Sequence, residues 1–486
     1  MRLDPTQCYR ALSSHDRRFD GRFFVGVTST GIYCRPVCRA RRPRPDRCRF
    51  FATAARAEAD GFRPCLRCRP ELAPGNAAID AGERLAAAAA SLVEDGLLDR
   101  QGVDAVAARL GITARHLRRV FEAEFGVSPI AFAQTQRLLL AKRLLADTAL
   151  PVTEVALASG FASLRRFNAL VRTRYGMTPL ALRGAGRGAR GDGAIDCTLR
   201  VMSPYDWSAI TTFLATRAVE GLEEVRGGTV RRVLRLARAA GPAIGVVEVG
   251  PAPKAGLLRV RVGPALLGVV PAVLARVKHV FDVTCRPQQI RRILGGLGEG
   301  APGLRVPGAF DGFELAVRAV LGQQVSVRAA RTLTARLVAA WGEPLEVPSG
   351  ALTHAFPDAE RVRRLRPQDV SGIGVPLARA RTIIGIAQRV AEGRLVLEPG
   401  VPMTATIGEL RAIPGVGEWT AEYIAMRALG WPDAFPAGDR GVQRALGVSS
   451  AREARARAEA WRPWRAYAVM HLWHQPHVAS LRGASD

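Results

Sequence analysis

The sequence predicts a multidomain, mainly α-helical protein that also contains two small α+β domains. The chain has 486 residues, and at about 150 residues per domain this length corresponds to three or four domains. Apolar residues recur at helical spacing over two long stretches, and they alternate, as in strands, over a shorter stretch between them. A cysteine-rich segment at the start and a glycine-rich run in the middle mark off the parts of the chain.

The composition indicates a polyanionic partner. Lysine and arginine number 70 against 43 acidic residues, which gives a net charge of +27. We expect this partner to be DNA. A GC-rich genome, which raises the arginine content of many proteins, is an alternative source of part of the charge. No apolar run approaches the roughly 20 residues that span a bilayer, so we expect no membrane partner. The N-terminus lacks an apolar secretion signal, which predicts a cytoplasmic protein with reduced cysteines.

Residues 1–78 are expected to form a small zinc-binding α+β domain. Cys34 and Cys38 form one close pair, and Cys65 and Cys68 form a second pair after a long loop. Two such pairs can place four thiolates around one Zn²⁺. The spacing alone leaves a purely structural zinc site open as the alternative.

The residues around these cysteines closely resemble the N-terminal domain of the Ada family of alkylation-response proteins, over Thr30–Arg41 and Gly61–Cys68. The resemblance implies that Cys34 irreversibly accepts a methyl group from a DNA phosphotriester. Zinc would keep this thiol deprotonated, and the thiolate is the nucleophilic form. The resemblance also gives candidate contacts to the DNA backbone, for which solvated surface side chains are the alternative: Thr30, Arg41 and Arg63. Cys48 has no assigned role.

Residues 79–183 are expected to form an all-α domain with two helix-turn-helix units. A helix from Val103 ends in a glycine turn and a threonine cap before a basic helix, and a related unit begins at Val152. The pair resembles the DNA-binding domain of AraC-type transcription regulators. The resemblance implies that the second helix of each unit enters the major groove. The candidate contacts, which solvated helix faces would also explain, are Arg115, His116, Arg118, Arg165 and Arg166.

The rest of the chain is expected to contain a linker and two domains. The glycine-rich run 184–194 predicts a flexible linker, because it has no apolar pattern to bury. Residues 195–304 predict a small α+β domain, since Ala243–Val249 and Leu257–Val262 alternate in the manner of strands. Residues 305–486 predict an all-α domain, with helical patterns that break at Pro344, Pro357, Pro376 and Pro414.

A Pro-Gly-x-Gly hairpin joins two helical stretches within residues 410–423. Backbone N–H groups near Gly415 and Gly417 can bind a DNA phosphate without sequence preference. Asp439 follows downstream. This helix-hairpin-helix arrangement resembles the AlkA-type 3-methyladenine DNA glycosylases, and the resemblance extends from about Ser203 to the end. It implies that Asp439 is the catalytic carboxylate, with a structural helix cap as the alternative role.

The resemblance also implies how a base would be held and released. A carboxylate beneath the sugar would stabilise the positive charge that develops as the N-glycosidic bond breaks. Aromatic faces would hold the extruded, often cationic, base. The candidate side chains, for which ordinary core packing is the alternative, are Trp419, Tyr423, Trp473 and Phe213.

Departures from related proteins refine this expectation. Trp419 stands where bifunctional relatives carry a Schiff-base lysine, so we expect a monofunctional enzyme without strand cleavage. No cysteine follows Cys285, so we expect no iron–sulfur cluster. Gln323 and Gln324 stand where an apolar residue can wedge into the duplex, and we expect them to contact DNA.

Together these features predict a DNA alkylation repair and response protein. We expect hydrolytic excision of alkylated purines of the 3-methyladenine type, methylphosphotriester repair by zinc-bound Cys34, and methylation-dependent transcription activation. Damaged and promoter double-stranded DNA and RNA polymerase are the expected partners of a monomeric, nucleoid-associated protein. The sequence contains no Pro-Cys-His-Arg motif, so we expect no repair of O6-alkylguanine. The alternative is a zinc-containing AraC-type regulator whose glycosylase-like half is inactive.

Overall fold

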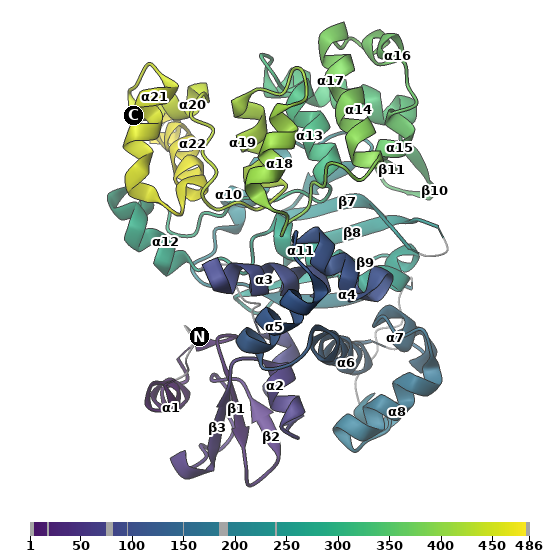
Figure 1. Cartoon of the computed structure of the whole chain (residues 1–486), viewed down its shortest axis with the longest axis vertical. Coiled ribbons are helices and arrows are strands. Elements are labelled where there is room, and N and C mark those ends of the chain that lie inside the picture. Colours follow the sequence, from purple (N-terminus) through teal and green to yellow (C-terminus); the bar gives the residue numbers. More distant parts are fainter. Residues whose placement is uncertain are drawn as a thin grey trace. The chain divides into compact units, whose positions relative to one another are not determined.

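The computed structural model describes residues 4–16, 19–73, 81–94, 96–148, 150–183, 193–238 and 241–482. Contacts within the chain divide it into two compact units. Unit 1 comprises Met1–Arg200, Leu236–Ala243 and Leu257–Ala275, and unit 2 comprises Val201–Arg235, Ile244–Gly256 and Arg276–Asp486. Helices dominate and small sheets accompany them (Figure 1). This is the multidomain, mainly helical fold class that the sequence predicts.

Unit 1 begins with a four-stranded sheet in the order β3-β1-β2-β4. β1 pairs antiparallel with β2 and β3, whereas β2 and β4 are parallel. Helices α1 and α2 begin where the side chains of Asp4 and Thr53 accept hydrogen bonds from the first turn. The bounds are α1 (Pro5–Ser13), β1 (Phe24–Val27), β2 (Ile32–Cys34), β3 (Cys48–Phe51), α2 (Ala54–Ala59) and β4 (Arg63–Pro64).

A helical region and one strand pair complete unit 1. The predicted second helices of the two helix-turn-helix units, α5 and α8, begin at Thr113 and Ser163, whose side chains accept a hydrogen bond from the N–H three residues later. Both helices end at left-handed glycines, Gly126 and Gly176. β5 pairs antiparallel with β9. The bounds are α3 (Ala81–Glu94), α4 (Leu97–Arg109), α5 (Ala114–Phe125), α6 (Pro129–Asp147), α7 (Val152–Ala158), α8 (Leu164–Tyr175), α9 (Pro179–Arg183), β5 (Ile195–Arg200) and β9 (Leu257–Val262).

Unit 2 places a short sheet beside a large set of helices. Its strands follow the order β8-β7-β6, with β6 antiparallel to β7. Helix α13 is buried along its whole length except at Arg318, so it forms the centre of the helical part. The bounds are α10 (Trp207–Ala215), β6 (Glu223–Arg226), β7 (Thr229–Leu236), β8 (Ala243–Pro251), α11 (Val270–Val280), α12 (Pro287–Leu294), α13 (Gly312–Leu321) and α14 (Val327–Trp341). The first part of α11, up to Ala275, belongs to unit 1.

The C-terminal part of unit 2 contains a strand pair that the sequence analysis did not predict. β10 (Glu343–Ser349) and β11 (Leu352–Ala355) form an antiparallel pair within the region expected to be wholly helical. Pro344 and Pro348 disfavour a helix there, and Gly350 turns the chain at a φ of +64°. The remaining bounds are α15 (Ala359–Val362), α16 (Pro367–Gly372), α17 (Leu377–Ala391), α18 (Met403–Arg411), α19 (Glu418–Arg427), α20 (Arg440–Leu446), α21 (Ala451–Ala458) and α22 (Arg465–Arg482).

Two predicted domain boundaries fall largely outside the described residues. Of the expected linker 184–194, the structure describes only Gly193 and Ala194, and the expected boundary after residue 78 lies in the undescribed range 74–80.

Among the described residues, no helix is long and apolar enough to cross a membrane.

Candidate active site and metal centre

Unit 2 contains a cavity of about 880 Å³. Helices α10, α13, α14, α19 and α22 contribute to its lining, together with the loop before α20. The cavity brings together the predicted carboxylate and all four predicted aromatic side chains, although more than 200 residues of sequence separate the first from the last. These lining residues are Phe213, Trp419, Tyr423, Asp439 and Trp473.

Three N–H donors fix the carboxylate of Asp439. Its Oδ2 accepts a hydrogen bond of 3.0 Å from the indole Nε1 of Trp419. Its Oδ1 accepts one of 2.9 Å from the indole Nε1 of Trp473 and one of 3.0 Å from the backbone N–H of Val442. The last bond makes Asp439 the N-cap of α20. Asp439 is therefore a helix cap that also lines the cavity, so the alternative role given from the sequence, a helix cap, does not exclude the predicted catalytic role.

The aromatic rings form a connected wall beside this carboxylate. Trp419 and Tyr423 stack with their centroids 5.3 Å apart and their planes within 9°. Tyr423 and Trp473 lie 6.4 Å apart in a tilted arrangement, and Phe213 stacks on Trp473 at 6.4 Å. The aromatic rings beside Asp439 therefore come from three helices, α10, α19 and α22.

The hairpin between α18 and α19 is held from two sides. Gly415 has a φ of +89°, and a Cβ atom there would lie 2.1 Å from Thr382 Oγ1, so only glycine fits. Thr382 Oγ1 donates to the carbonyl of Pro414 at 2.8 Å. Gly417 caps α19 without a side-chain hydrogen bond, which leaves the first turn of that helix to present its N–H groups.

The two predicted wedge residues differ in their surroundings. The Nε2 group of Gln323 donates to the carbonyl of Gly415 at 2.9 Å and to Thr420 Oγ1 at 3.0 Å, so it ties the loop after α13 to the hairpin. Gln324 is exposed and has a φ of +53°. Of the pair, Gln324 is therefore the one whose side chain is exposed to solvent, whereas Gln323 is bonded to the hairpin.

Unit 1 brings the four predicted zinc ligands together. The sulfur atoms of Cys34, Cys38, Cys65 and Cys68 all lie within 4.8 Å of one another. Four sulfurs at about 2.3 Å from a tetrahedral Zn²⁺ would be separated by somewhat less than 4 Å, so the cluster fits one zinc ion. The backbone N–H of Arg35 also donates to the sulfur of Cys68 at 3.4 Å, as expected for a thiolate acceptor.

The loop between Cys34 and Cys38 is held by an ion pair that the sequence analysis missed. Arg35 is 2% exposed, and its Nε donates to Asp20 Oδ1 at 2.7 Å. The same guanidinium donates to the carbonyl of Cys68 at 3.1 Å. A buried arginine needs such a partner, but the sequence gives no sign that Asp20 supplies it.

Comparisons with known proteins cover nearly the whole chain. A probable bifunctional transcriptional activator/DNA repair enzyme AlkA of Mycobacterium tuberculosis is 43% identical over 492 residues, which cover 97% of each chain. The chain belongs to this AlkA-type bifunctional family. Four domain profiles match it: the metal binding domain of Ada (7–71), a helix-turn-helix domain (106–185), the AlkA N-terminal domain (196–311) and the HhH-GPD superfamily of base excision DNA repair proteins (317–465).

Two further relatives cover separate parts of this AlkA-type chain. DNA-3-methyladenine glycosylase 2 of Escherichia coli is 37% identical over 277 residues, which are 57% of this chain and 96% of that protein. The bifunctional transcriptional activator/DNA repair enzyme Ada of Escherichia coli is 33% identical over 184 residues, which are 38% of this chain and 50% of that protein. The matched helix-turn-helix and base-excision domains make DNA a partner of this chain.

Two arginines of the AlkA-type cavity were missed by the sequence analysis. The guanidinium carbon of Arg217 lies 3.8 Å from the ring centroid of Phe213, and that of Arg427 lies 4.8 Å from it. Arg427 also donates to the hydroxyl of Tyr423 at 2.7 Å. Burial alone would raise the pKa of Tyr423, but nearby guanidinium charges, Arg427 first, lower it. In a chain so rich in arginine, no sequence signal distinguishes these two.

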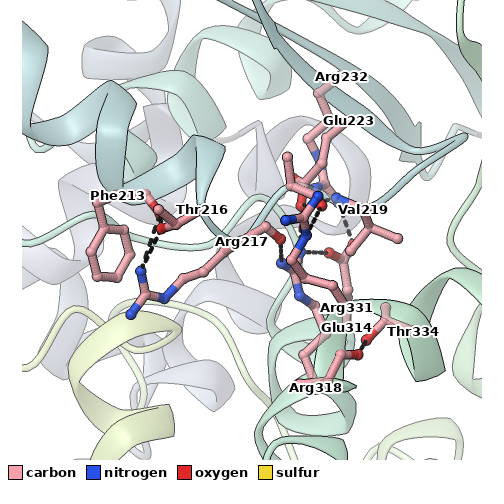
Figure 2. Close-up of polar contacts among 12 residues, drawn as sticks. Phe213, Thr216, Arg217, Val219, Glu223, Arg232, Glu314, Arg318, Arg331 and Thr334 are labelled. Atoms are coloured by element: carbon pink, nitrogen blue, oxygen red, sulfur yellow. Dashed lines mark hydrogen bonds and ion pairs between the residues drawn. The ribbon is translucent and has the colours of Figure 1, made fainter. Parts of the chain in front are cut away.

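A buried charge network holds the segment that carries Arg217 (Figure 2). Arg318 donates to Glu223 at 2.8 Å and to Glu314 at 3.0 Å, and Arg232 pairs with both acids. Arg318 also donates to the backbone carbonyl of Arg217. Since the two acids balance the two arginines, the network can stay buried and fix this wall of the cavity.

The predicted DNA contacts of unit 1 lie where DNA could reach them. Thr30, Arg41 and Arg63 are exposed in the zinc-binding part. Of the predicted groove contacts on α5 and α8, His116 is partly buried. The others are exposed: Arg115, Arg118, Arg165 and Arg166. Their exposure is what both the predicted role and its alternative, a solvated helix face, require.

Proposed function

We propose that this chain excises alkylated purines of the 3-methyladenine type from double-stranded DNA by hydrolysis. The observation that carries the proposal is the carboxylate of Asp439, held by the indole N–H groups of Trp419 and Trp473 at an aromatic-lined cavity. The similarity to DNA-3-methyladenine glycosylase 2 supports the choice of substrate class.

The proposed chemistry starts with an extruded nucleotide whose base lies among the aromatic rings. The bond between C1′ and the base nitrogen breaks, and its electron pair leaves with the alkylated base. The carboxylate of Asp439 stabilises the positive charge that remains on the sugar and orients a water molecule, whose oxygen bonds to C1′ as it loses a proton. An alkylated cationic base leaves as a neutral molecule, so no strong general acid is needed. With Trp419 in the place of a Schiff-base lysine, we propose a monofunctional enzyme.

We propose a second activity at the thiolate centre of unit 1. The sulfur of Cys34 attacks the methyl carbon of a DNA methylphosphotriester, an S–C bond forms, the C–O bond breaks, and its electron pair leaves a phosphodiester anion. Bound zinc would keep the four thiols deprotonated. Thr30, Arg41 and Arg63 would hold neighbouring phosphates. The similarity to Ada and the match to its metal binding domain support this role.

We propose that α5 and α8 bind promoter DNA through Arg115, His116, Arg118, Arg165 and Arg166, and that methylation at Cys34 switches this binding. Gly415, Gly417 and Gln324 would contact damaged DNA beside the cavity, while Gln323 would act through its bonds to the hairpin.

The proposed domains are 1–78, 79–183, 195–304 and 305–486, with 184–194 as the linker. We further propose a monomer that is associated with the nucleoid and recruits RNA polymerase.

Base release from methylated duplex DNA tests the glycosylase proposal. We expect Asp439→Asn to slow release of 3-methyladenine and 7-methylguanine by about a hundredfold, because the carboxylate charge is lost. Asp196→Asn is the matched control, since this aspartate is exposed on β5 and does not line the cavity. Equal release by the wild type and Asp439→Asn would overturn the proposal.

Intact-mass analysis tests the acceptor proposal. After exposure to a duplex that contains one methylphosphotriester, the chain should gain one methyl group, and peptide mapping should place it on Cys34. A methyl group on any other residue, or none, would contradict the assignment.

A further inference from the structure

One face of α6 packs against the zinc-binding part of unit 1, including α2. Thr135, Leu139 and Lys142 follow one another at four- and three-residue spacing, so they lie on the same side of the helix. Their side chains are nearly fully buried, at 3%, 5% and 3% exposure. Leu139 belongs to the core of the zinc-binding part, alongside Tyr33 and Phe62. Helix α6 lies between the two helix-turn-helix units, so it belongs to the DNA-binding region by sequence.

The C-terminal end of this face reaches the backbone of a zinc ligand. The ammonium group of Lys142 donates to the carbonyl of Cys65 at 3.3 Å and to Glu71 Oε2 at 2.7 Å. The N–H of Cys65 donates to the carbonyl of Tyr33 at 3.0 Å. The peptide groups on both sides of Cys65 are therefore fixed, one by α6 and the other by the residue that precedes Cys34.

The N-terminal end of the face reaches Tyr33 through a buried acid. The hydroxyl of Tyr33 donates to Glu58 Oε1 at 3.0 Å, and that of Thr135 donates to Glu58 Oε2 at 3.2 Å. Glu58 is 4% exposed. From α8, Arg174 donates to the carbonyl of Glu58 at 3.1 Å. Glu58 thus joins the zinc-binding part, α6 and α8 at one point.

We propose that α6 completes the methyl-acceptor centre, with Lys142 and Thr135 as positioning residues: Lys142 holds the backbone carbonyl of Cys65, and Thr135 holds, through Glu58, the side chain of Tyr33, the residue before Cys34. The inference rests on the proposed acceptor role of Cys34. Methyl transfer removes one negative charge from the thiolate cluster, and a buried ion pair responds strongly to a nearby charge. The state of Cys34 is therefore transmitted to α6, and by reciprocity the state of α6 acts on Cys34.

The test uses the full-length, zinc-loaded chain and a duplex with one methylphosphotriester. Lys142→Met removes the ammonium partner of the buried carboxylate of Glu71, which keeps its ion pair with Arg69, and it also removes the donor to the carbonyl of Cys65. We expect methyl uptake at Cys34, followed by intact mass, to slow about tenfold in this variant, and Lys142→Arg to restore it. Lys254→Met, in an exposed loop before β9, is the matched control and should react like the wild type.

Hydrogen–deuterium exchange gives a readout that a merely structural role would not move. In the wild type we expect methylation at Cys34 to change the exchange of the α6 amides by about threefold, and Lys142→Met to abolish this change. Unchanged exchange in the methylated wild type would overturn the inference, as would uptake at the wild-type rate by Lys142→Met.

If Lys142→Met loses zinc, Thr135→Val decides the question. This variant replaces the hydroxyl group with a methyl group of similar volume, so it removes the hydrogen bond to Glu58 with little change in packing. Slower uptake by a fully zinc-loaded Thr135→Val chain supports the inference, and unchanged uptake overturns it. A wild type that accepts no methyl group at Cys34 defeats the acceptor proposal itself, and the inference with it. A wild type that is methylated without any response in α6 defeats the inference alone.

Discussion

At the scale of single residues, one side chain can satisfy the fold and the chemistry at once. Asp439 caps α20 through the N–H of Val442 and accepts both indole N–H groups of the cavity. The sequence motif predicts an important aspartate at this position, but it cannot show that the two tryptophans orient it. Phe213 lies in the cavity as expected, but the guanidinium groups of Arg217 and Arg427 already contact its ring. A cationic base would therefore rely on the other rings.

The indole N–H of Trp473 provides a test at this scale. Trp473→Phe keeps a ring that can stack but removes the hydrogen bond to Asp439 Oδ1. We expect base release to slow about tenfold, equivalent to about 1.4 kcal/mol, because a hydrogen bond to a charged acceptor is lost. Single-turnover release of 7-methylguanine measures the effect. Trp341→Phe, which does not line the cavity, is the control, and identical rates for the two variants would refute the expectation.

At the scale of elements, local signals predicted helix starts and turns well. The threonine cap of α5 was predicted from the sequence, because capping depends on a few neighbouring residues. The structure shows the same kind of local signal in the serine cap of α8 and in the glycines that end both helices. The β10 and β11 pair was missed, because Pro344 was interpreted as a helix break rather than as part of a strand pair. The conformational preferences of single residues show where a helix ends, but pairing with a partner strand determines whether the next segment is a strand or a loop.

The hairpin before α19 is the element whose geometry is most easily tested. Gly415→Ala would place a methyl group 2.1 Å from Thr382 Oγ1 at a left-handed φ. We expect about 1–3 kcal/mol of destabilisation and weaker binding to undamaged duplex DNA at fixed salt. Thermal unfolding and a DNA titration measure both. Gly408→Ala in α18 has open space around the new methyl group and should bind DNA normally, so equal affinities for the two variants would contradict the expectation.

At the scale of the whole molecule, the charge of +27 and the matched domains agree on DNA as a partner. The chain folds into two compact units, with the thiolates in unit 1 and the Asp439 cavity in unit 2.

Buried titratable groups make the stability of such units depend on pH. His471 on α22 is 7% exposed, and burial, followed by the charge of His474, lowers its pKa to about 4.

The sign of this pH dependence follows from proton binding. Between pH 6.5 and 4 the unfolded chain protonates His471 while the folded chain does not, so stability rises with pH in this window. We expect His471 to lower the free energy of unfolding of the wild type by about 2 kcal/mol from pH 7 to pH 5. Denaturant unfolding of His471→Asn should show a loss that is smaller by this amount. An equal pH dependence in both proteins would rule the explanation out.

The sequence by itself determined the fold class, the four zinc ligands, the capped helix-turn-helix units and the position of the key aspartate, because each depends on residue types at short, fixed spacing. Only the tertiary structure decided which distant side chains act on them. Asp20 reaches Arg35, Arg427 contacts the ring of Phe213, and Lys142 reaches the carbonyl of Cys65. Such contacts join residues tens or hundreds of positions apart, and packing of whole elements, rather than local spacing, determines which of many similar arginines and acids meet.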